Sequence, residues 1–212
     1  SGNMSPVAID ESRANPHNQY AVSKYSQELY ALTLGKRFNI PTVVLRYSIT
    51  QGPRQSFYNA YSGILRIFAI RLLNDLPPII YEDGEQLRDY VYVGDTAKAN
   101  LLVMENDTAN YEAYNVGGRE VLSVSEYANL LMKVMGKDVT PQIPGEFRFG
   151  DTRHAVSDIS KLGKLGWFPR VSLEQIIREY VEWAEAQPCV SDYYAQAEKV
   201  MKQEGVIKTA RR

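Results

Sequence analysis

The chain has 212 residues, with 24 Lys and Arg against 25 Asp and Glu, and a formal net charge of -1. This balance without a basic stripe argues against a dedicated nucleic-acid binder, and one Cys with two His excludes a disulfide framework and the usual zinc ligand set. Because every apolar stretch is shorter than the ~18–20 residues of a membrane span and no charged-then-apolar leader opens the chain, we expect a cytoplasmic protein.

The first part of the chain predicts a helix followed by a buried strand. Residues 1–19 are polar and turn-rich, without a helix or strand pattern. Apolar residues at helical spacing predict a helix over 19–38. The segment Asn39-Ile40-Pro41 stops it, because the residue before a proline disfavours helix. The segment Thr42–Tyr47 is short, β-branched and apolar at its centre, which is typical of a strand covered on both faces.

Alternating short strands and helices are predicted for the rest. They comprise a buried helix over Tyr61–Leu73, strands at Ile79–Tyr81, Tyr90–Val93 and Tyr114–Val116, and a helix that Asp95 caps and that reaches about Met104. Ser123 with Glu126 predicts a capping box for a helix to Met135, and Ser172 with Gln175 repeats the pattern. The tail beyond Pro188 is compatible with helix.

The predicted strand at Thr42–Tyr47 lacks partners in the preceding sequence. A doubly covered strand implies parallel neighbours, and the helix before it implies an earlier strand in a right-handed β–α–β unit. Nothing in residues 1–19 can form that strand. Either the partner strands come from another chain, or the sequence belongs to a longer protein.

A candidate acid–base pair stands at the start of the first helix. Tyr20 and Lys24 are four residues apart, so both point to one side. A phenol can act as a base at neutral pH when a fixed ammonium stabilises its phenolate. Such a pair is common by chance, but its position directly before a parallel-type strand gives it weight.

A series of sequence blocks carries a family resemblance. The blocks are Pro16–Lys24, Leu45–Tyr47, Gly52–Gln55, Asp83–Val93, Tyr114–Gly117, Arg148–Asp151, Asp158–Lys161 and Leu165–Trp167. In this order they resemble the extended short-chain dehydrogenase/reductases, and within them the NAD-dependent epimerase/dehydratase family of nucleotide-sugar enzymes. The resemblance covers nearly residues 9–187.

The resemblance implies roles on the cofactor side. Tyr20 takes the proton from a sugar hydroxyl as hydride passes to the nicotinamide of NAD. Lys24 holds the nicotinamide-side ribose and favours the phenolate of Tyr20. Tyr47 and Ser48, at the end of the strand, lie beside the nicotinamide, where ligands bind in such sheets.

On the substrate side, the resemblance implies that Arg88 and Arg148 bind the substrate diphosphate, since a guanidinium matches phosphate oxygens. Asp151 accepts from the nucleoside ribose hydroxyls. The family usually has Phe-Asn where this chain has Ser48-Ile49, so an amide contact to the substrate is missing, and Asn59 is a candidate to replace it. His154 is expected to be structural.

The glycine-rich dinucleotide fingerprint is absent from the sequence. Its nearest approach is Gly163 with Gly166, where Pro169 holds the third place. The family's catalytic Ser or Thr lies upstream of the Tyr, and no residue of this chain is assigned to that role. We therefore expect a C-terminal part that lacks the N-terminal Rossmann segment, and that missing segment is expected to complete the sheet.

The expected fold is α/β: an incomplete Rossmann-type parallel sheet, consisting of the catalytic helix and the following strand, with a C-terminal α/β substrate-binding domain. The expected divisions are 1–58 for the remnant of the NAD-binding domain, 59–187 for the nucleotide-sugar-binding domain and 188–212 for a helical tail. The intact protein is expected to be a homodimeric nucleotide-sugar 4-epimerase acting on a UDP- or dTDP-hexose. Two alternatives stay open: a 4,6-dehydratase, and a non-catalytic sugar-nucleotide-binding or dimerisation module.

Overall fold

The computed structural model describes residues 8–57, 63–187 and 194–209. The chain forms two compact units that alternate along the sequence. Unit 1 comprises Ser1–Thr50, Asp89–Arg119 and Ala155–Val171, and unit 2 comprises Gln51–Arg88, Glu120–His154 and Ser172–Arg212. The predicted divisions at 58/59 and 187/188 follow chain order and function, and they stay a prediction.

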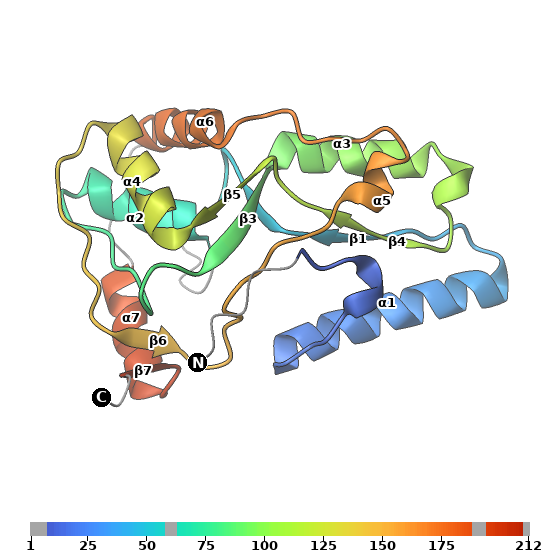
Figure 1. Ribbon diagram of the computed structural model, residues 1–212, viewed down its shortest axis with the longest axis horizontal. Helices are drawn as coiled ribbons and strands as arrows, with labels where there is room; N and C mark the ends of the chain where they lie inside the picture. Colours follow the sequence, from blue (N-terminus) through green and yellow to red (C-terminus); the bar gives the residue numbers. More distant parts are fainter. Residues whose placement is uncertain (1–7, 58–62, 188–193, 210–212) are drawn as a thin grey trace. The chain divides into compact units, whose positions relative to one another are not determined.

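Unit 1 is built on a parallel pair of strands, β1 (Val44–Tyr47) and β4 (Ala113–Val116). Figure 1 shows α1 (Gln19–Phe38) on one side of this pair and α3 (Val93–Met104) on the other. The short elements η1 (Glu11–Arg13), η2 (Asp107–Ala109) and α5 (Ser160–Gly163) complete the unit. The buried core contains Val91, Ala99, Val103, Ala109, Tyr114, Val116, Leu162 and Trp167. The parallel pair with helices on its faces confirms the expected α/β class.

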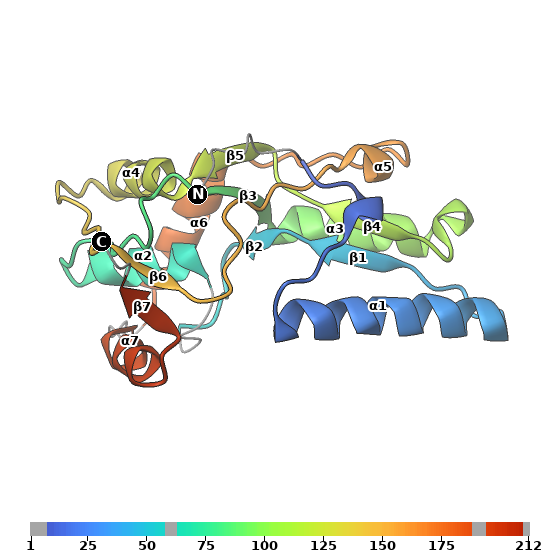
Figure 2. The same cartoon turned by 60° about the horizontal axis from the view of Figure 1, so that its bottom comes forward.

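Helix α1 runs over the predicted residues 19–38, and Figure 2 shows its full length. Asn18 caps its start, because its side chain accepts a hydrogen bond from the Ala21 N–H at 2.8 Å. Asn39 ends it in the left-handed region, with φ 54°. Near this end, a Cβ on Gly35 would lie 2.4 Å from Thr42 Oγ1, so only glycine lets the chain turn from helix to strand so closely.

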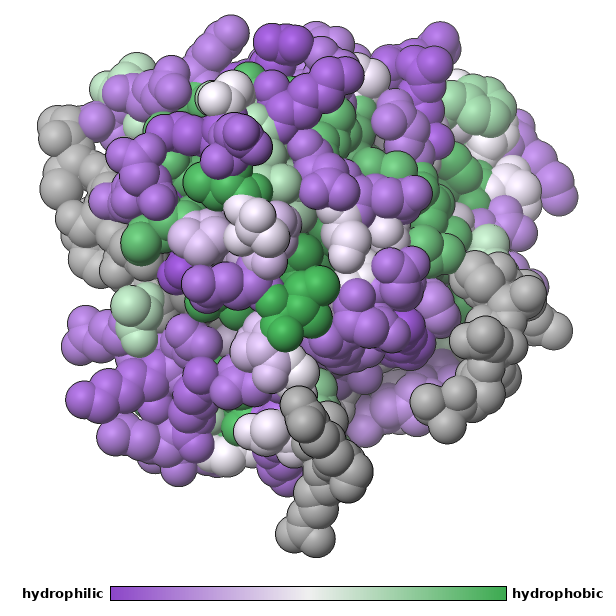
Figure 3. Space-filling model, turned by 60° about the vertical axis from the view of Figure 1, so that its left-hand side comes forward, coloured by the Kyte–Doolittle hydropathy of each residue, from purple (hydrophilic) through white to green (hydrophobic). Residues whose placement is uncertain are grey.

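Unit 2 contains the helices α2 (Ile64–Leu73), α4 (Val124–Met135) and α6 (Leu173–Glu185). Its C-terminal part forms α7 (Tyr194–Gln203) and β7 (Ile207–Thr209), and β7 pairs antiparallel with β6 (Glu146–Arg148). Apolar side chains of the three helices point inward, and Leu65, Leu131 and Ile176 are fully buried. On the face seen in Figure 3, hydrophilic residues predominate and apolar residues show only in smaller areas between them.

Three further strands, β2 (Ile49–Gln51), β3 (Leu87–Tyr92) and β5 (Glu120–Ser123), form a sheet of order β2-β3-β5. No helix within the described residues is both long and apolar enough to cross a membrane.

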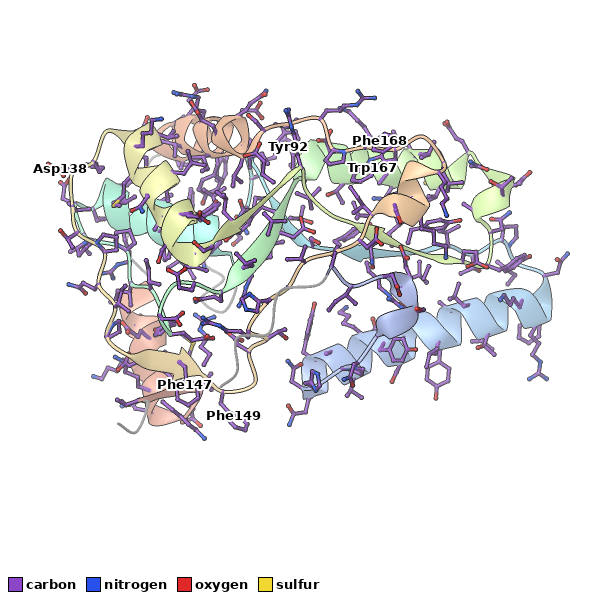
Figure 4. All side chains as sticks on the ribbon, in the orientation of Figure 1. Tyr92, Asp138, Phe147, Phe149, Trp167 and Phe168 are labelled. Carbon is purple, nitrogen blue, oxygen red and sulfur yellow. The ribbon has the colours of Figure 1, made fainter. Side chains whose placement is uncertain are left out.

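The prediction that Asp95 caps α3 is wrong. The helix begins at Val93, with Tyr92 as its N-cap residue, so Asp95 lies inside the first turn. Its buried carboxylate instead accepts from the backbone N–H groups of Arg170 at 2.7 Å and Val171 at 3.0 Å. Trp167, labelled beside α3 in Figure 4, donates its indole N–H to the Asp95 carbonyl at 3.0 Å. Asp95 therefore anchors the 167–171 segment to α3.

Other local predictions fare differently. The capping box of Ser123 and Glu126 is confirmed, with both reciprocal hydrogen bonds present, and Ser172 caps α6. The strand predicted over 79–81 is reduced to an isolated bridge between Ile79 and Gln142, because no longer partner strand runs beside it in the described residues. The tail is helical as expected, but it also contains β7, which the sequence pattern did not indicate.

Candidate active site

Tyr20 and Lys24 lie side by side on the first turns of α1. The Lys24 Nζ atom is 5.9 Å from the centroid of the Tyr20 ring, and it donates to Gln27 Oε1 at 3.3 Å. The Tyr20 side chain is largely exposed, with a residue exposure of 72%. A phenol and an ammonium therefore stand together on an open face of the helix, available to a ligand.

Tyr47 and Ser48 stand at the carboxyl end of β1, the edge at which parallel sheets bind their ligands. Tyr47 is half-exposed, and its hydroxyl donates to Asn100 Oδ1 at 2.9 Å. The Ser48 backbone N–H continues the ladder to the Val116 carbonyl at 2.9 Å. The Ser48 hydroxyl points to Asp89, with 2.8 Å between Oγ and Oδ2.

Asp89 is a buried carboxylate that joins three segments of unit 1 by hydrogen bonds. The sequence patterns did not identify this role. Only 2% of the residue is exposed, and its carboxylate accepts from the Ser48 hydroxyl and from the backbone N–H groups of Gly118 and Ser157. A Cβ on Gly118 would lie 1.6 Å from the Tyr90 carbonyl oxygen, so only glycine can bring its N–H this close. The signal was available: a carboxylate next to an apolar strand needs buried donors.

Burial raises the pKa of Asp89 above its ordinary value of 3.8, while hydrogen bonds from Gly118, Ser48 and Ser157 act in the opposite direction. Because the raised value belongs to the folded state, the contribution of Asp89 to stability is complete below its unfolded pKa and is lost as the pH rises through the folded pKa. We therefore expect the free energy of unfolding of unit 1, relative to Asp89→Asn, to fall with rising pH in this window.

Urea unfolding of both proteins between pH 4 and pH 8 measures this difference. Trp167 lies in the core of unit 1, so its fluorescence in a Trp183→Phe background reports on that unit, since the chain has two Trp residues. A difference between the two proteins that stays constant over the whole pH range would contradict the expectation.

The residues predicted for the substrate side gather in unit 2. Arg148 ends β6, and its Cζ atom lies 5.4 Å from the centroid of the Tyr81 ring. Desolvation by the surrounding protein raises the pKa of Asp151, and the positive charges of Arg148 and Arg88 oppose this shift. The structure therefore brings both guanidinium groups within electrostatic reach of the Asp151 carboxylate, although Arg88 lies 60 positions before Arg148 in the sequence.

Arg88 also holds backbone. Its Nη1 atom donates to the carbonyls of Leu87 at 2.9 Å and Arg153 at 2.8 Å, and Nη2 donates to the Thr152 carbonyl at 2.9 Å. His154 accepts at Nδ1 from the Leu87 N–H at 3.2 Å, which is a structural contact of the kind expected for it. Asn59 lies outside the described residues.

Strand β7 supports the strand that carries Arg148. The two strands pair from Glu146↔Thr209 to Arg148↔Ile207, and the Phe149 N–H donates to the Val206 carbonyl at 2.9 Å. Figure 4 labels Phe147 and Phe149 at this strand pair. No cluster of three His, Cys, Asp or Glu residues that could hold a metal ion occurs in the part of the chain that the structure describes.

Comparison with known proteins places this arrangement in a family. Residues 2–117 match the model of the NAD dependent epimerase/dehydratase family. The chain is 33% identical over 182 residues to dTDP-L-rhamnose 4-epimerase of Burkholderia thailandensis, which covers 85% of this chain and 50% of that protein. Proteins named dTDP-glucose 4,6-dehydratase match as well. The chain spans about half the length of the curated relatives it matches.

Solved structures agree with the sequence relatives. A UDP-glucose 4-epimerase of Thermotoga maritima, solved with UDP-glucose, has a TM-score of 0.78 and 36% identity over 86% of this chain and 59% of its own. A UDP-glucose 4-epimerase of Thermus thermophilus, solved with NAD, has a TM-score of 0.76 and 32% identity over 85% of this chain and 58% of its own. The chain therefore belongs to the NAD-dependent epimerase/dehydratase family, within the extended short-chain dehydrogenase/reductases.

Proposed function

We propose that this chain is the C-terminal part of an NAD-dependent nucleotide-sugar 4-epimerase, which inverts C4 of a UDP- or dTDP-hexose through a transient keto sugar. The observation that carries the proposal is the Tyr20 and Lys24 pair on the open face of α1, in a chain of this family. The similarity to 4-epimerases of two nucleotide classes supports both the reaction and the substrate class.

Tyr20 provides the proton transfer in the proposed reaction. Its phenolate oxygen takes the proton of the sugar 4-hydroxyl as that carbon loses its hydride and becomes a carbonyl. When hydride is delivered to the opposite face of the carbonyl, Tyr20 returns the proton to the 4-oxygen of the sugar. The phenolate of Tyr20 is thereby restored, and atoms and electrons balance over one cycle. Lys24 stabilises the negative charge on the Tyr20 oxygen through its ammonium group.

The residues of unit 1 fit the nicotinamide side of NAD. Tyr20 and Lys24 offer an exposed phenol and an exposed ammonium, and the half-exposed Tyr47 stands at the carboxyl end of a parallel strand, where such sheets bind their ligands. Tyr20, Lys24, Tyr47 and Ser48 are the residues proposed to hold it. When bound, NAD supplies reversible hydride acceptance, which is the redox chemistry that the side chains lack.

Unit 2 is proposed to bind the nucleoside diphosphate. Arg88 and Arg148 supply guanidinium groups for the phosphate oxygens, and Asp151 accepts from ribose hydroxyls. Asn59 stays a candidate for the missing amide contact. A few placed arginines are enough for this task in a chain whose formal net charge is only -1.

A titration of the purified 212-residue chain tests this assignment. We expect UDP-glucose or dTDP-glucose to bind, and Arg148→Gln to weaken that binding by about 10–100-fold, since a hydrogen bond to a charged group contributes ~1.5–3 kcal/mol. Arg178→Gln is the matched control, because Arg178 pairs with Glu174 on the surface of α6. Equal affinities of wild type and Arg148→Gln would remove Arg148 from the site.

The same titration and a product assay separate the other candidates. Sugar-nucleotide binding without any NAD-dependent turnover by the intact protein favours a binding module, whereas release of a 4-keto-6-deoxy sugar identifies a 4,6-dehydratase. The 4,6-dehydratase reaction is kept as an alternative because proteins of that name are among the relatives. The homodimer and the preceding segment that completes the sheet stay predictions, and the molar mass of the intact protein in solution tests the first of them.

A further inference from the structure

Residues 149–154, the loop that follows β6, contain Asp151 and come directly after Arg148. The proposed function uses those two residues and Arg88, but it leaves unexplained how the loop is held. Phe149 is tied to the C-terminal segment through the Val206 carbonyl, and Gly150 has φ 86°. The rest of the loop, from residue 152 onward, is held by a different set of contacts.

The side chain of Arg153 forms the shortest of these contacts. Its Nη1 atom lies 2.6 Å from Asp83 Oδ1 and 2.7 Å from Glu82 Oε2, and its Nη2 atom lies 2.8 Å from Asp83 Oδ2. The pairing with Asp83 is bidentate, the geometry that adds specificity to charge attraction. The guanidinium of Arg153 holds the pKa of Asp83 below its ordinary value through this hydrogen bond, so the carboxylate is charged at neutral pH.

The partners of Arg153 lie on a turn that leads into the strand of Arg88. Glu82 has φ 59°, and its N–H donates to the Glu146 carbonyl of β6 at 2.7 Å. The Asp83 carboxylate also accepts from the Glu85 N–H at 2.9 Å, which fixes the turn. The ion pair therefore connects a hydrogen-bonded turn beside β6 to the loop that follows β6.

The backbone of the same loop also contacts Arg88. Arg88 donates to the carbonyls of Thr152 and Arg153, which uses part of its five N–H donors. The backbone of Arg153 thus contacts Arg88 while its side chain contacts Asp83. Any movement of residue 153 would shift the relative positions of Arg88 and Asp151.

We propose that Arg153 and Asp83 are positioning residues for nucleotide-sugar binding: their ion pair sets the 149–154 loop so that Arg88, Arg148 and Asp151 meet one nucleoside diphosphate. This inference rests on the proposed function of unit 2. It adds two residues that need not touch the ligand themselves. Both are accessible, with side-chain exposures of 42% for Arg153 and 58% for Asp83, so their substitution spares the core.

Asp83→Asn distinguishes a positioning role of Arg153 from direct contact of Arg153 with the ligand, because the two roles predict opposite changes in nucleotide-sugar affinity. If Arg153 itself bound phosphate, removing the competing carboxylate would free its guanidinium and strengthen binding. Removing a negative charge near a diphosphate also strengthens binding through simple electrostatics. Positioning alone predicts the opposite result, because the loop loses its anchor.

The experiment titrates UDP-glucose, dTDP-glucose and UDP into the 212-residue chain by calorimetry. We expect Asp83→Asn and Arg153→Gln each to raise the dissociation constant about 3–10-fold, with unchanged thermal midpoints. The reversed pair, Asp83→Arg with Arg153→Asp, is expected to recover most of the affinity in a Glu82→Gln background, which is needed because Glu82 also pairs with residue 153 and would repel a carboxylate there. Lys137→Gln is the control, since it breaks an exposed ion pair of 2.6 Å with Asp75 elsewhere in unit 2.

The outcomes are distinct. Tighter or unchanged binding by Asp83→Asn, in a wild-type chain that binds the sugar nucleotides, overturns the positioning role and leaves the proposed function standing. A reversed pair that binds no better than either single variant overturns it as well. A wild-type chain that binds none of the three ligands overturns the proposed substrate site together with this inference.

Discussion

Tyr20→Phe in the intact protein is expected to lower kcat of the proposed epimerisation by about 10²–10⁴-fold, the usual contribution of a positioned proton-transfer group. The substitution removes one oxygen from a side chain that is 72% exposed, so folding and substrate affinity should hardly change. Turnover is measured by conversion of the sugar nucleotide, and binding by titration of the same protein with UDP-glucose or dTDP-glucose.

Tyr30→Phe is the matched control for this experiment. Tyr30 lies on the same helix and is 71% exposed, but it stands well away from Lys24 along the helix, at a spacing of six residues. Its loss should leave kcat within about twofold. Retained turnover in Tyr20→Phe, or an equal loss in Tyr30→Phe, would take the proton-transfer role away from Tyr20.

Glu28→Ala is expected to lower the free energy of unfolding of unit 1 by about 2–4 kcal/mol. The Glu28 carboxylate forms a bidentate pair with Arg46, with 2.7 Å from Nε to Oε2 and 2.6 Å from Nη2 to Oε1. Glu28 is buried on α1, and the Arg46 side chain on β1 is 24% exposed. Removing one partner of such a pair leaves the other charge poorly compensated in the interior.

The pair also holds the helix of Tyr20 and Lys24 against β1. Arg46 donates in addition to the Glu11 carbonyl at 3.0 Å, so its guanidinium joins three segments of unit 1. Urea unfolding followed by Trp167 fluorescence measures the loss. Glu112→Gln, which breaks an exposed pair with Lys161, should cost at most about 1 kcal/mol. If the two substitutions cost the same, the Glu28 pair is not the anchor of α1.

Local patterns in the sequence predicted the elements whose signals are local. The bounds of α1 follow from helical spacing and from the Asn39-Ile40-Pro41 stop, and the capping box of Ser123 follows from two residues three apart. The same reasoning failed for Asp95, since its carboxylate bonds to the backbone of Arg170 and Val171, some 75 residues away. Nothing near Asp95 in the sequence announces those donors.

The residues of the candidate site likewise fall into those that local sequence patterns reveal and those that only the folded structure or the family resemblance reveals. Tyr20 and Lys24 are recognisable because the helix alone brings them together. The contacts of Asp89 with Ser157 and of Arg153 with Asp83 join residues 68 and 70 positions apart, and only the folded chain reveals them. Family resemblance supplied Arg88, Arg148 and Asp151, whose individual residue types would otherwise indicate ordinary surface charges.

The alternation of the two units has a consequence for how the chain is made. Unit 1 includes residues as late as Val171, and its β1 strand must wait for β4, 69 positions later in the register Val44↔Ala113. A ribosome releases the chain in order from the N-terminal side, so β1 emerges well before β4. During that interval the edge of β1 that later pairs with β4 is exposed and needs protection from aggregation.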